Sequence, residues 1–184
     1  MRWNQISRRR ILQGMSLAAT VTELAATDLE VPTEDIGLGP FYKAGAPERH
    51  SLRETGMAGE PLRVAGKVLD TRGRPIAGAR VEMWHVDSKG EYDKTGFRLR
   101  GQVACAANGE YHFETMAPVA YGSRCAHVHV RVSAPGANIL ATEIQFAGDP
   151  VAAKDRGARP SLAMKTTTKN GERHGAFVFV LRSA

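Results

Sequence analysis

Residues 124–132, RCAHVHVRV, place His127 and His129 two residues apart in a stretch that alternates between apolar and polar side chains. Such alternation is typical of a β-strand with one buried face. The two imidazoles therefore point to the same side of the strand, and the valines point to the other. Two histidines on one strand face are often exposed or hydrogen-bonded residues, but they can also bind a metal ion, including zinc, copper or iron.

A metal site needs further ligands that balance the charge of the ion. Tyr121 lies six residues before His127, and Tyr92 lies in a turn after an upstream strand. A phenol, whose ordinary pKa is about 10, binds a metal only if the ion is a strong Lewis acid. Two phenolates and two imidazoles suit Fe(III) better than zinc or Fe(II). Asp87 and Glu143 leave open the alternative of Fe(II) held by two histidines and one carboxylate.

Short alternating segments separated by turns predict the strands that must position these side chains. The expected strands cover residues 62–69, 79–86, 102–106, 110–115, 126–132, 139–146 and 176–181. Asn108 followed by Gly109, between two alternating runs, predicts a β-hairpin. The pattern as a whole predicts an all-β fold, namely an antiparallel β-sandwich of prealbumin-like or Greek-key type with long loops.

Residues 1–26 are expected to be a twin-arginine export signal. Adjacent arginines, at positions 8–10, precede a short and weakly apolar run that contains Glu23, and this run is too short and polar for a membrane span. The mature domain is then expected to cover residues 27–184. The mature chain would act in the periplasm or outside the cell, without a stable membrane anchor.

The composition is that of one globular domain, with 42% hydrophobic and 24% charged residues in a chain of 184. Residues 1–26 account for half of the net charge of +6. Because no basic cluster is interleaved with aromatic residues, nucleic-acid binding is not expected. Cys105 and Cys125 lack the spacing of a zinc site, and the sequence does not determine whether they pair. Cys125, beside the histidines, could be redox-sensitive.

The run AYGSRCAHVHV resembles a signature of the intradiol ring-cleavage dioxygenases, which are non-haem Fe(III) enzymes that include protocatechuate 3,4-dioxygenase and catechol 1,2-dioxygenase. In that family an arginine stands three residues before the first histidine of a His-x-His pair, as Arg124 stands before His127. Upstream, GKVLDTRGRPIAGARVEMWHVDSKGEYD resembles the second family signature, and GPFY at 39–42 resembles the N-terminal loop. The likeness covers approximately residues 33–182 in order.

The resemblance implies a site and a reaction. Tyr92, Tyr121, His127 and His129 would hold Fe(III). Tyr121 would leave the metal and act as base for a catechol proton, and Arg124 would stabilise negative charge beside the reacting ring. The implied substrates are a small aromatic diol and O2, and the ring would open between its two hydroxyl-bearing carbons to give a cis,cis-muconate. The resemblance also makes a homo-oligomer possible, although nothing in the sequence specifies one.

The resemblance also suggests that Pro40, Tyr42 and Glu143 line the substrate pocket. Two positions depart from the family pattern: Val119 replaces a glycine, which could narrow the pocket, and Glu143 replaces a glutamine. Glu143 could pair with Arg124 and weaken its electrostatic role, or repel an acidic substrate. The alternative interpretation is a prealbumin-like or carboxypeptidase-regulatory-like binding module without catalysis, which VAGKVLDTRGRPIAGARVEMW also resembles. Such modules do not require the four proposed ligands together. The sequence leaves open which catechol is bound.

Overall fold

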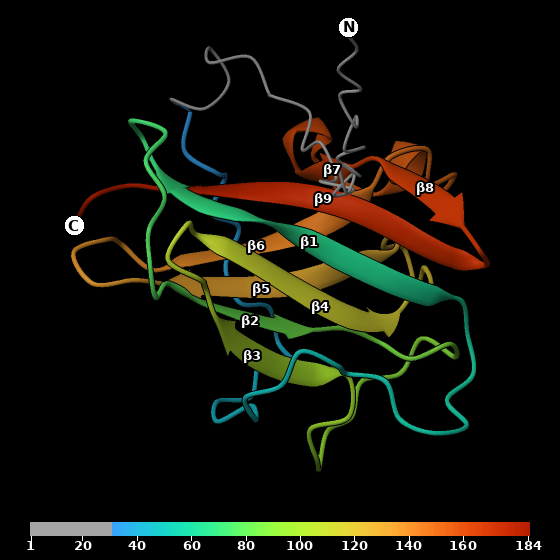
Figure 1. The fold of residues 1–184 in the computed structure, drawn as a ribbon. Coiled ribbons are helices and arrows are strands. Elements are labelled where there is room, and N and C mark those ends of the chain that lie inside the picture. The colour runs from blue at the N-terminus through green and yellow to red at the C-terminus, as the bar shows by residue number, and fades with distance from the viewer. Residues whose placement is uncertain (1–30) are drawn as a thin grey trace, which may run out of the picture.

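The computed structural model describes residues 31–184, which form two β-sheets packed face to face (Figure 1). The proposed export signal, residues 1–26, lies outside the described residues. No helix within residues 31–184 is both long and apolar enough to cross a membrane. The elements in chain order are β1 (Pro61–Asp70), β2 (Arg80–Trp84), β3 (Arg100–Ala104), β4 (Glu110–Met116), β5 (His127–Ser133), β6 (Leu140–Phe146), the short 3-10 helices η1 (Ala152–Lys154) and η2 (Pro160–Leu162), β7 (Ala163–Met164), β8 (Thr166–Lys169) and β9 (Glu172–Leu181).

The two sheets have different sizes. One has four strands in the order β4-β1-β9-β8, and the other has five in the order β3-β2-β5-β6-β7. Most neighbouring strands are antiparallel, but β1 runs parallel to β9 and β6 runs parallel to β7. The predicted all-β sandwich is confirmed, with mixed rather than purely antiparallel sheets. Alternating hydrophobicity predicts strands but carries no information about the direction of a distant partner strand.

The core lies between the two sheets. Val128, Val130 and Val132 of β5 are completely buried and pack in one cluster with Phe113 and Phe179 from the other sheet. Burial of each such side chain contributes roughly 1.5–3 kcal/mol. A slip of one residue in β5 would move all three valines from the core to the outer face of the sheet, so the core determines which way the alternate residues point. The predicted alternation along 126–132 is therefore confirmed.

The predicted hairpin at Asn108 and Gly109 is wrong, although the turn itself is present. Gly109 has a φ of +76°, and its N–H donates to the Ala106 carbonyl at 2.9 Å. However, β3 pairs with β2, and β4 pairs with β1. The turn therefore carries the chain from one sheet to the other. An Asn-Gly pair specifies a tight turn, but the packing of the flanking strands decides whether they pair.

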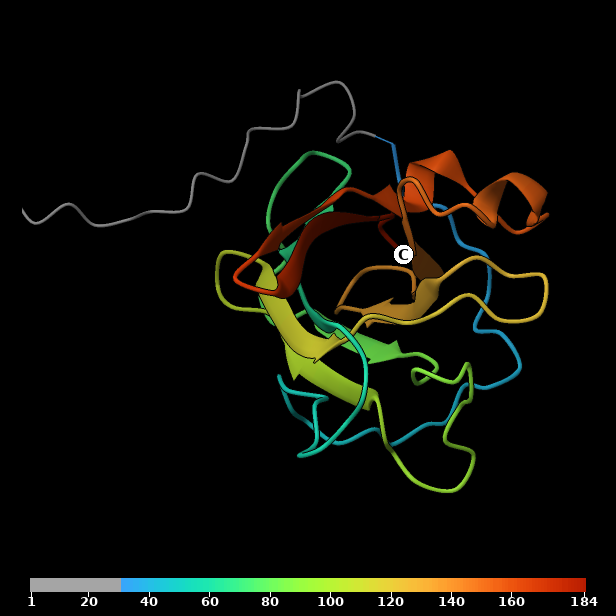
Figure 2. The same cartoon turned by 90° about the vertical axis from the view of Figure 1, so that its right-hand side faces the viewer.

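A long extended segment, residues 33–51, runs along the five-stranded sheet. The Ile36 N–H donates to the Ala141 carbonyl of β6 at 2.8 Å, and farther along the segment Glu48 forms a bridge with Gln102 of β3. Figure 2 shows this segment in blue along one side of the molecule. It therefore spans from β6 to β3 and covers outward-facing side chains of the strands between them.

Candidate metal centre

Cross-strand register brings the proposed histidine ligands to one patch on the outer face of the five-stranded sheet. His129 of β5 pairs with Trp84 of β2 on one side and with Glu143 of β6 on the other. His127 pairs with Gln145 in the neighbouring row. Directly paired residues point to the same face of a sheet, so these side chains lie together. Trp84 stacks on His129 with ring centroids 5.2 Å apart.

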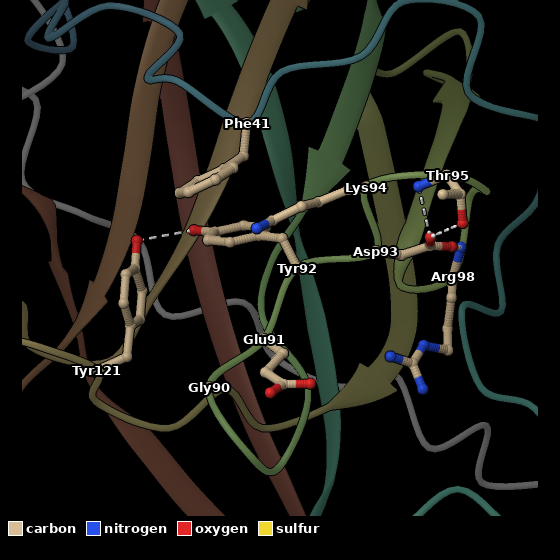
Figure 3. A pocket seen from close by; sticks show the side chains of 9 residues that line it. All are labelled: Phe41, Gly90, Glu91, Tyr92, Asp93, Lys94, Thr95, Arg98 and Tyr121. Carbon is tan, nitrogen blue, oxygen red and sulfur yellow. Dashed lines mark hydrogen bonds between the residues drawn. The ribbon is translucent and has the colours of Figure 1, made fainter.

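The two tyrosines reach this patch from loops. Tyr92 follows the turn after β2, and Tyr121 lies in the loop before β5. Their hydroxyl oxygens are 3.0 Å apart, and the Tyr121 oxygen is 3.3 Å from Nε2 of His127. Figure 3 shows the two hydroxyl groups facing each other, with Phe41 stacked on the ring of Tyr92. The structure thus brings the four proposed ligands together, with the rings of His127 and His129 4.8 Å apart.

The imidazole nitrogens are arranged as metal ligands would be. Both ring nitrogens of His129 are buried and lack a hydrogen-bond partner within residues 31–184. Nδ1 of His127 donates to the Cys125 carbonyl at 2.7 Å, so Nε2 keeps its lone pair on the side of Tyr121. Burial lowers the pKa of His129 to about 3 and also lowers the pKa of His127. Both imidazoles are therefore neutral, which is the form that binds a metal.

The phenol of Tyr92 is likewise consistent with a metal site. Burial raises the pKa of Tyr92, and the neighbouring Tyr121 hydroxyl raises it further. Tyr92 is thus a neutral phenol unless a cation binds beside it and stabilises the phenolate. An unpartnered polar atom in the interior costs on the order of 1–3 kcal/mol, and an ion bound to one ring nitrogen of His129 would remove that cost for the nitrogen that binds it. Two phenols and two imidazoles together fit Fe(III).

Arg124 lies beside the patch between two carboxylates. Its Nη2 is 2.6 Å from Oε2 of Glu143, and its Nε is 3.1 Å from Oδ2 of Asp155. Burial alone would lower the pKa of Arg124, but the two carboxylates outweigh it and raise that pKa. Asp155 in turn accepts hydrogen bonds from the backbone N–H groups of Cys125 and Gly157, at 2.9 and 2.7 Å. The sequence suggested that Arg124 pairs with Glu143, but it gave no indication that Arg124 also pairs with Asp155.

Two cavities open beside the patch, and Phe41 and Tyr121 line both. The first has a volume of about 410 Å³. Its lining residues are Ile36, Gly37, Gly39, Pro40, Phe41, Tyr121, Arg124, His129, Glu143, Gly157 and Arg159. The second has a volume of about 500 Å³ and is drawn in Figure 3. Apart from Phe41 and Tyr121, its lining residues come from the segment 90–98, which contains Tyr92. Pro40 and Glu143 therefore lie at the first cavity, together with Arg124 and His129.

Tyr42 lines neither cavity, in contrast to the prediction. Its hydroxyl donates to Oε2 of Glu82 at 3.4 Å, and its ring packs against Trp84. Phe41 is the residue of this loop that lies at the cavities. Neighbouring side chains in an extended segment point to opposite sides, and the sequence of an irregular loop does not show which side faces the site.

Other expected neighbours of the site have structural roles. Asp87 pairs with Arg98 at 3.0 Å and accepts backbone hydrogen bonds in its own turn, so it is not the carboxylate beside the histidines. Val119 packs in the cluster around Trp84 and lines neither cavity. Cys125 is buried and unpaired, and burial raises the pKa of its thiol to about 12, which makes it unreactive.

Comparison with known proteins places the chain among aromatic-ring dioxygenases. A protein-family model described as Dioxygenase matches residues 38–183. The catechol 1,2-dioxygenase of Pseudomonas sp. (strain EST1001) is 33% identical over 75% of this chain and 55% of its own length. Catechol 1,2-dioxygenase 1 of Acinetobacter lwoffii is 36% identical over 72% of this chain and 53% of its own length. The chain therefore spans about half the length of the curated relatives it matches.

One solved structure matches a larger share of this chain than these two relatives do. It is the dioxygenase domain of a dioxygenase–carbohydrate-binding protein fusion from Streptomyces sp. SirexAA-E. It has a TM-score of 0.80 and 36% identity, and the match covers 84% of this chain and all of that domain.

Proposed function

This chain belongs to the intradiol ring-cleavage dioxygenase family, and we propose that it uses Fe(III) to cleave a catechol-type ring between the two hydroxyl-bearing carbons. The reaction combines one aromatic diol with one O2 and gives a cis,cis-muconate that contains all the atoms of both. The observation that carries the proposal is that two phenols and two imidazoles lie together, and that the buried ring nitrogens of His129 have no hydrogen-bond partner within residues 31–184.

Tyr92, Tyr121, His127 and His129 would hold the iron. Bound there, Fe(III) would supply the Lewis acid that activates the aromatic diol toward O2. Tyr121 lines the 410 Å³ cavity, and in this proposal its phenolate oxygen accepts a proton from a substrate hydroxyl. The same cavity contains the guanidinium of Arg124, which stabilises negative charge that develops on the ring.

The charges around the cavity favour an uncharged catechol. Two arginines line it, and each is already paired within the described residues: Arg124 with Glu143 and Asp155, and Arg159 with Glu34 at 2.9 Å. A carboxylated diol in this cavity would bring another negative charge beside Glu143, and both arginines that line the cavity are already paired with carboxylates. Catechol, an uncharged substituted catechol or a hydroxyquinol therefore fits the site better than protocatechuate.

Labelling with ¹⁸O₂ tests the proposal. The iron-loaded full chain is incubated with catechol and ¹⁸O₂, and the product is analysed by mass spectrometry. We expect a muconate that contains both labelled atoms, no product with His129→Ala, and a yield close to that of the unmodified chain with Tyr42→Phe, whose side chain lies outside the cavities. Binding of catechol without consumption of O2 by the iron-loaded chain would contradict the proposal and favour the non-catalytic module.

Export remains a prediction that is independent of the reaction. We propose that residues 1–26 direct the chain to the periplasm and that the catalytic domain begins at residue 27. Mass spectrometry of the chain recovered from the periplasm checks both, since a mature chain that retains residues 1–26 would contradict them.

A further inference from the structure

Glu143 is a buried carboxylate whose pairing with Arg124 involves only one of its two oxygens. Oε2 accepts hydrogen bonds from Nη2 of Arg124 at 2.6 Å and from Nε2 of Gln145 at 3.2 Å. Oε1 accepts none from residues 31–184. It lies 3.6 Å from Nδ1 of His129 and 3.8 Å from Nε2 of His127. Glu143 therefore presents a free oxygen to the two histidines.

These two distances are too long for hydrogen bonds, but they suit atoms that share an ion. Two donors that each lie about 2.1 Å from one metal ion are at most about 4.2 Å apart. The distances from Oε1 of Glu143 to His129 and His127, 3.6 and 3.8 Å, are below this limit, and the three side chains form a group whose possible ligand atoms all lie within 4.8 Å of one another. The unpartnered, buried nitrogens of His129 independently indicate that an ion belongs beside Oε1.

We propose that Glu143 is a fifth protein ligand of the metal, binding through Oε1 while Arg124 and Gln145 hold Oε2. The inference rests on the iron centre of the proposed function. The register of the sheet supports it, because Glu143 is the direct cross-strand partner of His129, so both side chains lie on the same face of the sheet.

The charges support it as well. Two tyrosinates neutralise only two of the three charges of Fe(III), and the Glu143 carboxylate supplies the third. The positive charge of Arg124 then remains balanced by Asp155, at 3.1 Å. A glutamine at position 143 would leave the protein ligands one negative charge short, and a solvent-derived anion would have to supply it. Glu143 thus makes the protein's own ligand set neutral with Fe(III).

Iron binding by Glu143→Gln is the test, with Glu82→Gln as the matched control. Glu82 is also a buried carboxylate on the outer face of this sheet, 5% exposed, but it lies beside Tyr42 and Arg131 rather than at the histidines. The iron-free full chains are loaded with Fe(III), and the dissociation constant is measured by competition with a chelator. The visible tyrosinate-to-iron absorption band is recorded from the same samples.

Glu143→Gln is expected to weaken Fe(III) binding on the order of tenfold or more. Its band should move to longer wavelength, because iron with one anionic ligand fewer accepts an electron more readily. Glu82→Gln should change neither quantity. Unchanged affinity and band position in Glu143→Gln would overturn the inference.

A second variant separates ligation from a general effect of charge. Glu143→Asp keeps the negative charge but withdraws the carboxylate by one methylene, so it too should weaken iron binding and shift the band. Iron binding like that of the unmodified chain would refute direct ligation. This variant also keeps the inference testable if Glu143→Gln does not fold.

Binding of a divalent ion tests the role of Glu143 in a site that lacks both tyrosine hydroxyl groups. Tyr92→Phe/Tyr121→Phe retains His127, His129 and Glu143, two imidazoles and a carboxylate, a set that suits divalent ions. We expect it to bind Co(II), with a visible spectrum, and expect Glu143→Gln in that background to weaken binding on the order of tenfold. Equal Co(II) affinity with and without Glu143 would overturn the inference.

Failure of the inference and failure of the proposed function are distinguishable. Ring cleavage by the unmodified chain, with metal affinity that does not depend on Glu143, overturns the inference and leaves the function intact. Metal affinity that depends on Glu143, without ring cleavage, supports the fifth ligand and contradicts the proposed function.

Discussion

Replacement of Asp155 by asparagine would show how far Arg124 depends on the carboxylates that hold it. Asp155 accepts hydrogen bonds from Nε of Arg124 and from the backbone N–H groups of Cys125 and Gly157, at 3.1, 2.9 and 2.7 Å. An asparagine of the same shape has a single acceptor oxygen. Whichever way the amide is turned, its NH₂ faces a donor, either the N–H of Gly157 or the pair from Arg124 and Cys125.

The expected cost follows from these contacts. A hydrogen bond to a charged group contributes about 1.5–3 kcal/mol, and the side chain of Asp155 is only 2% exposed. Loss of one or two such bonds should lower the free energy of unfolding by about 3 kcal/mol. Burial opposes ionisation of Asp155, but the bonds from Cys125, Gly157 and Arg124 outweigh it and lower its pKa to about 2 from an ordinary 3.8. Their stabilisation is present above about pH 4 and is lost as the pH falls toward 2.

Asp149→Asn is the matched control for this variant. Asp149 also accepts two backbone hydrogen bonds, from Ala126 at 2.9 Å and Val151 at 2.8 Å, but it forms no hydrogen bond or ion pair with Arg124. Urea unfolding and steady-state kinetics with catechol are measured for both. Both variants should lose stability, whereas only Asp155→Asn should lower kcat/KM, on the order of tenfold. Equal kcat/KM in the two variants would refute a positioning role for Asp155.

Further predictions concern the core, the segment over His129 and a thiol. His85 lies buried, with Nε2 2.7 Å from Oγ1 of Thr115, and burial lowers its pKa to about 4 from an ordinary 6.5. The unfolded chain therefore binds this proton first, so stability should be complete above about pH 7 and fall between pH 6.5 and 4; urea unfolding of His85→Gln should lack this loss. Gly39→Ala would place a Cβ 2.9 Å from Cε1 of His129 at a φ of +69°, so iron content should fall while the far-UV circular dichroism stays the same. A thiol reagent should modify Cys125 only in denaturant, because the thiol is buried and its pKa is about 12; labelling of Cys125 in the folded chain would contradict this.

The predictable part of the fold is the part that depends on local alternation. The valines of β5 alternate with polar residues over the whole strand, so one buried face is visible in the sequence. Sheet membership is not visible in the same way. The parallel pairing of β1 with β9 joins residues more than a hundred positions apart, and the failure of the Asn108 hairpin arises because β3 and β4 each pack with other strands.

The part of the candidate site that lies within short sequence motifs could be predicted. The spacing of Arg124, His127 and His129 lies within one strand and its entry loop, so the sequence shows it directly. Asp155 lies in an irregular segment with no periodicity and reaches Arg124 only because that loop folds back onto the patch. Phe41 was missed for a related reason, since the side that a loop residue faces is decided by what packs against it.

The visible absorption spectrum of the purified chain, measured with its iron content before and after addition of catechol, tests the central claim most directly. We expect a single iron per chain, a broad tyrosinate-to-iron band that makes the protein red-brown, and a shift of that band with catechol, followed by uptake of O2. A protein that stays colourless after reconstitution with ferric ion would contradict the metal centre and with it the proposed reaction.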